Sequence, residues 1–117
     1  MEKRRVLVLD DEMLVAMMLE DMLDDLGFDV VGPFGGLETA LEPARTEPLD
    51  GAIIDLNLGR GQLSTPVAEV LRARGIPFLL ATGYGANAQT DELGHSGLLA
   101  KPFSTGDVEA ALKAMLG

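Results

Sequence analysis

The sequence contains no cysteine and no tryptophan, a single histidine and a single tyrosine, and only nine basic residues among 117. Without cysteine the chain can form neither a disulfide framework nor a thiolate zinc site, which fits a reducing compartment. Nineteen acidic residues give a formal net charge of -10 and an isoelectric point near 4.3. Because binding to phosphate backbones depends on concentrated Lys and Arg, this balance argues against a nucleic-acid partner.

Long apolar runs are also missing near the start of the chain. A basic cluster, Lys3 to Arg5, is followed by only four apolar residues and then by Asp10, Asp11 and Glu12. So short a run fits neither a secretory signal nor a membrane span, and we expect a cytoplasmic protein that does not enter a membrane. With 47% apolar residues, we expect residues 1–117 to form one domain with one core and no effector domain.

The apolar pattern alternates between short continuous runs and longer amphipathic stretches. The short runs predict buried strands at 6–9, 28–31, 49–54, 76–81 and 98–100. The amphipathic stretches predict helices at 12–26, 37–45, 65–74 and 104–117, with a weaker one around 86–92. We expect Pro43 to kink or shorten the second helix, because proline lacks the N–H that the helix needs. Five strand–helix units favour an α/β fold, with a mainly parallel sheet covered by helices on both faces.

Polar side chains follow four of the five expected strands. Asp10 and Asp11 follow the first strand, Asp55 the third, Thr82 the fourth and Lys101 the fifth. Ligands of open parallel sheets bind beyond the carboxyl ends of the strands, so these side chains are expected to meet at one rim. Each one alone has an ordinary structural explanation, such as a helix cap for Asp10 or Asp11. Their joint occurrence points to a site.

Three carboxylates at one rim require a cation. At 4 Å and an effective dielectric constant of 20, each pair repels by about 4 kcal/mol. Oxygen ligands without His or Cys suit Mg²⁺, whose charge together with that of Lys101 balances Asp10, Asp11 and Asp55. A pocket neutralised in this way can accept a phosphoryl group, and a carboxylate can be the nucleophile.

These residues resemble the receiver domain of bacterial two-component response regulators, the CheY-like family, over essentially the whole chain. The resemblance rests on Asp10-Asp11, Asp55, Thr82 and Lys101-Pro102-Phe103. It implies a doubly wound, flavodoxin-like sheet of five parallel strands in the order 2-1-3-4-5. It also implies a stand-alone receiver, a monomer or weak dimer, phosphorylated by a sensor histidine kinase or a histidine phosphotransfer protein in a Mg²⁺-dependent phosphorelay.

The resemblance also implies a role for each marker residue. Asp55 is the phosphoacceptor, and Thr82 and Lys101 bind the phosphoryl oxygens. Mg²⁺ is held by Asp10, Asp11, Asp55 and the backbone carbonyl of Asn57. The Lys101–Pro102 peptide bond is expected to be cis.

One segment is similar to a narrower group of receivers. Residues 77–84 read PFLLATGY and look like the PFxFATGY stretch of the FATGUY subgroup, with Leu80 in place of the second Phe. Receivers commonly carry an aromatic switch residue three positions before the lysine, and Leu98 occupies that position here. Tyr84 is therefore our candidate for the switch residue.

The first helix offers a candidate docking surface. Helical spacing predicts a buried face made of Val15, Met18, Leu19, Met22, Leu23 and Leu26. Met13 and Met17 then fall on the far side, with Leu14 at the margin. Because the resemblance implies that the helical bundle of a kinase docks over this helix, we expect Met13, Leu14 and Met17 to contact it.

Two other functions stay open. The first is a Mg²⁺-dependent phosphatase with an aspartate nucleophile, like haloacid-dehalogenase-type enzymes, whose Asp-x-Asp pair after the first strand is missing here. The second is a pseudo-receiver that binds a partner without phosphorylation, although all five marker side chains are present. We expect a signalling domain that catalyses only its own phosphorylation and dephosphorylation.

Overall fold

The computed structural model describes residues 3–59, 62–83 and 94–117. Its five strands are β1 (Arg5–Leu9), β2 (Asp29–Phe34), β3 (Gly51–Asp55), β4 (Phe78–Thr82) and β5 (Gly97–Ala100). All neighbouring strands are parallel, and their order is β2-β1-β3-β4-β5. The helices are α1 (Met13–Asp25), α2 (Leu37–Thr46), α3 (Thr65–Ala73) and α5 (Thr105–Leu116). The predicted α/β fold and strand order are confirmed, while the helix predicted around 86–92 lies outside the described residues.

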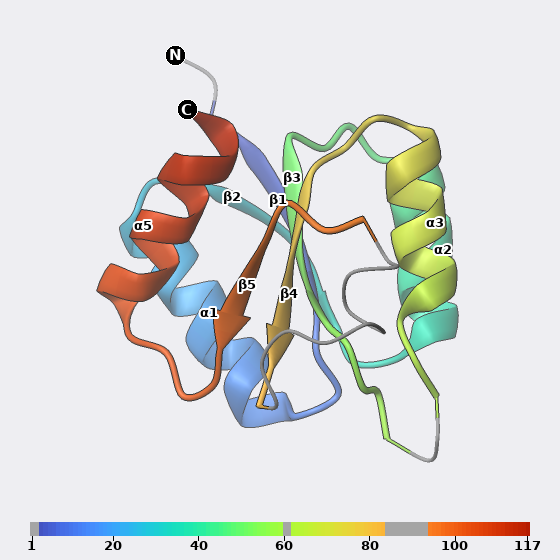
Figure 1. Ribbon diagram of the computed structural model, residues 1–117, viewed down its shortest axis with the longest axis horizontal. Coiled ribbons are helices and arrows are strands. Elements are labelled where there is room, and N and C mark those ends of the chain that lie inside the picture. Colours follow the sequence, from blue (N-terminus) through green and yellow to red (C-terminus); the bar gives the residue numbers. More distant parts are fainter. Residues whose placement is uncertain (1–2, 60–61, 84–93) are drawn as a thin grey trace.

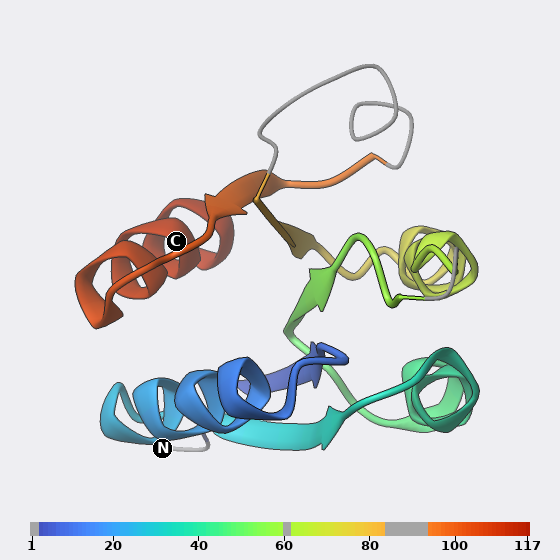
Figure 2. The same ribbon diagram turned by 90° about the horizontal axis from the view of Figure 1, so that it is seen from below.

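The sheet is the middle of three layers (Figure 1), with α1 and α5 on one face and α2 and α3 on the other (Figure 2). Successive strand residues face opposite layers, so Val6 and Val8 pack towards α1 and α5, whereas Leu7 and Leu9 pack towards α2 and α3. Both faces of β1 are therefore buried, which explains its continuous apolar run. No helix among these residues is long and apolar enough to cross a membrane.

The buried face of α1 differs from the predicted one at two residues, Met18 and Ala16. Ala16, Leu19 and Leu23 are buried at spacings of three and four residues. Met18 falls outside the arc that these three define and is 49% exposed, so the prediction that it is a core residue is wrong. The sequence pattern favoured the large Met18 and overlooked the small Ala16, which is buried.

The α2 helix passes through Pro43 and ends at Thr46, so the expectation that proline shortens it is wrong. Proline removes one backbone donor from the helix. The fully buried Ala40 and Ala44 hold the segment against the sheet on both sides of the proline. In addition, the Glu47 N–H donates to the Pro43 carbonyl at 2.9 Å, and the Arg74 guanidinium donates to the Ala44 carbonyl. Tertiary packing and these end contacts outweigh the missing donor.

The β2 strand runs three residues beyond its predicted end and supports the rim. Gly32 has φ +106°, and a Cβ there would lie 2.8 Å from the Phe34 nitrogen, so only glycine fits. The Gly32–Pro33 peptide bond is cis, and the register with β1 shifts between Leu7 and Leu9. Phe34 then accepts a hydrogen bond of 3.0 Å from the Asp10 N–H. The end of β2 thereby fixes the backbone of Asp10.

Candidate functional site

The parallel strands bring the predicted rim residues together at one edge of the sheet. Asp10 follows β1, Asp55 and Thr82 are the last residues of β3 and β4, and Lys101 follows β5. Between them lies a cavity of about 570 Å³. It is lined by Asp11, Glu12, Asp55, Leu56, Asn57, Gly59, Leu63, Thr82, Gly83 and Lys101.

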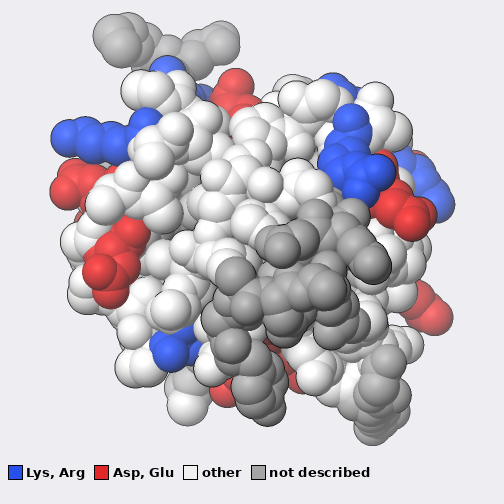
Figure 3. Space-filling view, in the orientation of Figure 1, with Lys and Arg blue, Asp and Glu red and all other residues white. Residues whose placement is uncertain are grey.

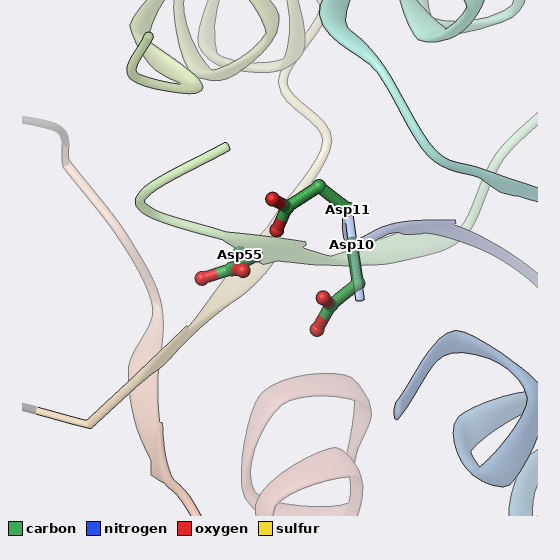
Figure 4. A group of neighbouring side chains, drawn as sticks. All are labelled: Asp10, Asp11 and Asp55. Atoms are coloured by element: carbon green, nitrogen blue, oxygen red, sulfur yellow. The ribbon is translucent and has the colours of Figure 1, made fainter. Parts of the chain in front are cut away.

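Three carboxylates meet beside this cavity (Figure 4). Oxygen atoms of Asp10, Asp11 and Asp55 lie within 4.8 Å of one another, with Asp10 and Asp55 buried and Asp11 exposed. Asp10 Oδ1 accepts a 2.9 Å hydrogen bond from the Glu12 N–H. The buried Asp10 Oδ2 accepts none from any residue that the structure describes. A cluster of hard oxygen donors in which one buried oxygen accepts no hydrogen bond fits a divalent cation such as Mg²⁺.

The Lys101 ammonium lies in the middle of the acidic groups. Its Nζ is 3.2 Å from each of three oxygens: Asp10 Oδ2, Glu12 Oε1 and Asp55 Oδ2. The contacts with Glu12 and Asp55 are hydrogen bonds. Burial alone would lower the pKa of Lys101, but the charges of Asp10 and Asp55 and these hydrogen bonds outweigh it and raise the pKa. Lys101 therefore stays charged.

At Asp55, burial and the Lys101 ammonium shift the pKa in opposite directions. Burial and the nearby Asp10 carboxylate raise its pKa from the ordinary 3.8 to about 6. Lys101 and the Asn57 N–H, which donates to Asp55 Oδ1 at 3.4 Å, act in the opposite direction. At neutral pH the group is mostly ionised, so a basic carboxylate oxygen faces the cavity.

The loop after β3 forms the wall next to Asp11. The Gly59 N–H donates to Asn57 Oδ1 at 2.9 Å, and the Leu58 N–H donates to the Gln62 carbonyl at 3.0 Å. Gly59 has φ +78°, and a Cβ there would lie 3.0 Å from Asp11 Oδ2. Glycine therefore allows the loop to approach the Asp11 carboxylate closely.

The remaining predicted residues divide into three groups. Thr82 is buried and lines the cavity, and the Lys101–Pro102 peptide bond is cis. Met13, Leu14 and Met17 are exposed on α1 directly after the rim, and Met18 joins them. Tyr84 lies outside the described residues.

Sequence reasoning missed the contact between Glu12 and Lys101. An acid at the start of a helix has an ordinary explanation, because the helix dipole favours negative charge there. The three successive acids at 10–12 were the available signal, because the third of them can also reach the rim.

The chain belongs to the response regulator receiver domain family, whose model matches residues 6–113. Among solved structures, that of SdrG from Sphingomonas melonis Fr1 is 40% identical, with a TM-score of 0.84 and full coverage of both chains. The probable chemotaxis protein CheY of Rhizobium etli is 30% identical and matches 99% of this chain and 95% of its own. The transcriptional regulatory protein PdtaR of Mycobacterium tuberculosis is 30% identical over 94% of this chain. This chain spans about half of PdtaR, 55% of its length.

Proposed function

We propose that Asp55 accepts a phosphoryl group from the phosphohistidine of a sensor histidine kinase or a histidine phosphotransfer protein. One observation carries this proposal: a buried carboxylate at the end of the central strand lies 3.2 Å from a lysine ammonium and beside two further carboxylates. Membership of the receiver family supports it.

The chemistry needs few groups. An oxygen of Asp55 attacks phosphorus, a P–O bond forms as the P–N bond breaks, and the imidazole leaves with its electron pair and takes up a proton. Lys101 and Thr82, both at the cavity, would donate to the phosphoryl oxygens. Asp10, Asp11, Asp55 and the Asn57 carbonyl would hold Mg²⁺, which supplies positive charge to those oxygens when bound. Asp10 Oδ2, which pairs with Lys101 by charge but accepts no hydrogen bond from the described residues, supports this ligand set.

A small acyl phosphate such as acetyl phosphate tests the nucleophile without any kinase. With Mg²⁺ present, we expect the parent protein to gain one phosphoryl group, located on Asp55 by peptide mass. Asp55→Asn should remove the labelling, whereas Asp29→Asn, at the opposite end of the sheet, should keep it. Comparable labelling of Asp55→Asn would show that the nucleophile is another residue.

We propose a signalling domain in preference to a phosphatase. The Asp-x-Asp pair of the phosphatase family is missing after β1, where Asp10-Asp11-Glu12 stands.

We also propose that the receiver acts on its own, which the almost complete match to the Rhizobium etli relative supports. Under the same proposal, residues 77–84 assign the chain to the FATGUY subgroup, with Tyr84 as the switch residue. The apolar, partly buried Leu98 has no hydrogen-bonding group for that role.

The partner surface that we propose is the exposed start of α1. Met13, Leu14 and Met17 form a soft apolar area directly beside the rim, and Met18 extends it. Methionine side chains are unbranched and adapt to the surface of a partner helix. A histidine-bearing helical bundle docked there would lie next to Asp55. On the face seen in Figure 3, the visible charged side chains of both signs lie mostly towards the edge of the view.

A further inference from the structure

Glu12 stands in a position that the proposed phosphotransfer does not yet use. It is hydrogen-bonded to Lys101, 89 residues away in the sequence, with Oε1 3.2 Å from Nζ. This contact joins the start of α1 to the segment between β5 and α5, across the rim. It is one of the three contacts of equal length around the ammonium.

The three carboxylates differ in their access to water. The side chain of Asp10 is 0% exposed and that of Asp55 is 7% exposed, whereas that of Glu12 is 62% exposed. A buried carboxylate that loses its cation is left without compensation, so release of Asp10 or Asp55 is costly. Water can solvate Glu12 as soon as it is released. Glu12 is therefore the partner that Lys101 can exchange at low cost.

An ammonium has three N–H donors, and three acidic oxygens surround this one. A phosphoryl group on Asp55 would add oxygens that need a donor from Lys101. Two of the three donors already form hydrogen bonds, to Glu12 and Asp55, and the ammonium is also paired by charge with Asp10 Oδ2. The new oxygens therefore compete with these acidic oxygens for the ammonium, and the exposure of the three side chains identifies Glu12 as the partner that is displaced at the lowest cost.

We propose that Glu12 is a positioning residue that holds Lys101 while Asp55 is unphosphorylated and releases it when the phosphoryl group arrives. This inference rests on the proposed function. Since the contact with Glu12 exists only before phosphorylation, it favours the unphosphorylated state. Its loss also disconnects the start of α1, where Met13 begins the proposed docking surface, from the Lys101 segment.

Two substitutions of Glu12 and one control separate the contact from its charge. Glu12→Gln removes the charge, and Glu12→Asp keeps the charge but shortens the side chain by one methylene. Asp21→Asn is the control, because it changes the net charge equally at an exposed position of α1. The phosphorylated fraction is measured by intact mass at saturating Mg²⁺ and fixed acetyl phosphate, and thermal melts check folding.

Both Glu12 variants should raise the ratio of phosphorylated to unphosphorylated protein by about three- to fivefold, the value of a partly exposed ion pair. Asp21→Asn should match the parent. A Glu12→Asp variant that behaves like the parent would show that charge alone acts, and unchanged ratios in both variants would show that the contact has no role. Either result overturns the inference while the proposed function stands. A parent that takes up no label would overturn both.

A second measurement needs no variant. In the parent protein, the NMR signal of the Glu12 carboxylate carbon should move when acetyl phosphate and Mg²⁺ are added together, whereas that of Asp21 should stay. A Glu12 signal that stays while Asp55 is phosphorylated would overturn the inference, because Lys101 would then keep the contact.

Discussion

At Asp55 burial opposes ionisation, although the proposed chemistry needs the ionised form. Burial and Asp10 raise its pKa to about 6, and Lys101 offsets only a part of this effect. A carboxylate that is costly to ionise is also more basic than an exposed one, which favours bond formation with phosphorus. Ionised Asp55 therefore lowers the stability of the folded protein and is more reactive for the same physical reason.

This conflict predicts how stability depends on pH. Between the unfolded pKa of about 4 and the folded pKa of about 6, the folded protein binds a proton that the unfolded chain does not. The stability that this proton contributes is complete below the lower value and is lost as the pH rises through the upper one. In Mg²⁺-free buffer, Asp55→Asn should therefore be more stable than the parent by about 1–3 kcal/mol near neutral pH.

Urea denaturation of both proteins with EDTA present, at about pH 5 and about pH 7.5, measures this difference. The gain from Asp55→Asn should be smaller at the lower pH. An equal gain at both values would mean that the substitution acts through packing and not through the charge of Asp55.

Mg²⁺ binding should depend on Asp11 more than on Thr82. Asp11 contributes a charged oxygen to the three-carboxylate cluster, whereas the hydroxyl of Thr82 is neutral. We expect Asp11→Ala to weaken Mg²⁺ binding at least about tenfold and Thr82→Ala to weaken it far less, as titration calorimetry can measure. Equal affinities of the parent and Asp11→Ala would place the ion elsewhere.

At the scale of elements, α1 has two functions on opposite sides. Ala16, Leu19 and Leu23 attach it to the sheet, while Met13, Leu14 and Met17 face solvent. Because the exposed side chains contribute little to the core, they can be changed without unfolding the helix.

Replacing Met13 and Met17 together by Gln should slow phosphotransfer from the cognate kinase by about tenfold, because apolar contacts with the helical bundle are lost. Labelling by acetyl phosphate and the free energy of unfolding should stay near the parent values. Equal loss with both donors would assign the methionines to the fold or the cavity, and unchanged transfer from the kinase would exclude them from the interface.

Replacing the proline inside α2 should make the protein more stable. Pro43 leaves one backbone acceptor of the helix without its usual donor, and Ala at this position restores it. We expect Pro43→Ala to raise the free energy of unfolding by about 1–3 kcal/mol, as urea denaturation can measure. Pro48→Ala, between α2 and β3, is the matched control. A gain no larger than that of the control would show that Pro43 costs the helix nothing.

At the scale of the whole molecule, the sequence predicted the strands and the rim because both follow from periodicity and from the chain direction of parallel strands, whereas the strand order followed from the resemblance to the receiver family. It also predicted the last helix, whose start is fixed by both hydrogen bonds of a capping box between Ser104 and Asp107. It could not predict that α2 keeps its length despite Pro43 or that Met18 is exposed, because tertiary packing decides both. The contact between Glu12 and Lys101 joins distant segments, and no local pattern encodes it.

The two ends of the described chain lie side by side, where Arg4 Nη1 donates to the Leu116 carbonyl at 2.9 Å (Figure 1). They lie at the amino ends of the strands, and the cavity lies at the carboxyl ends. An affinity tag, a dye or a surface tether attached at either end would leave the cavity open to solution. A short peptide could also join the two ends into a circular permutant, with new termini between α2 and β3, that still assembles the rim on the opposite side.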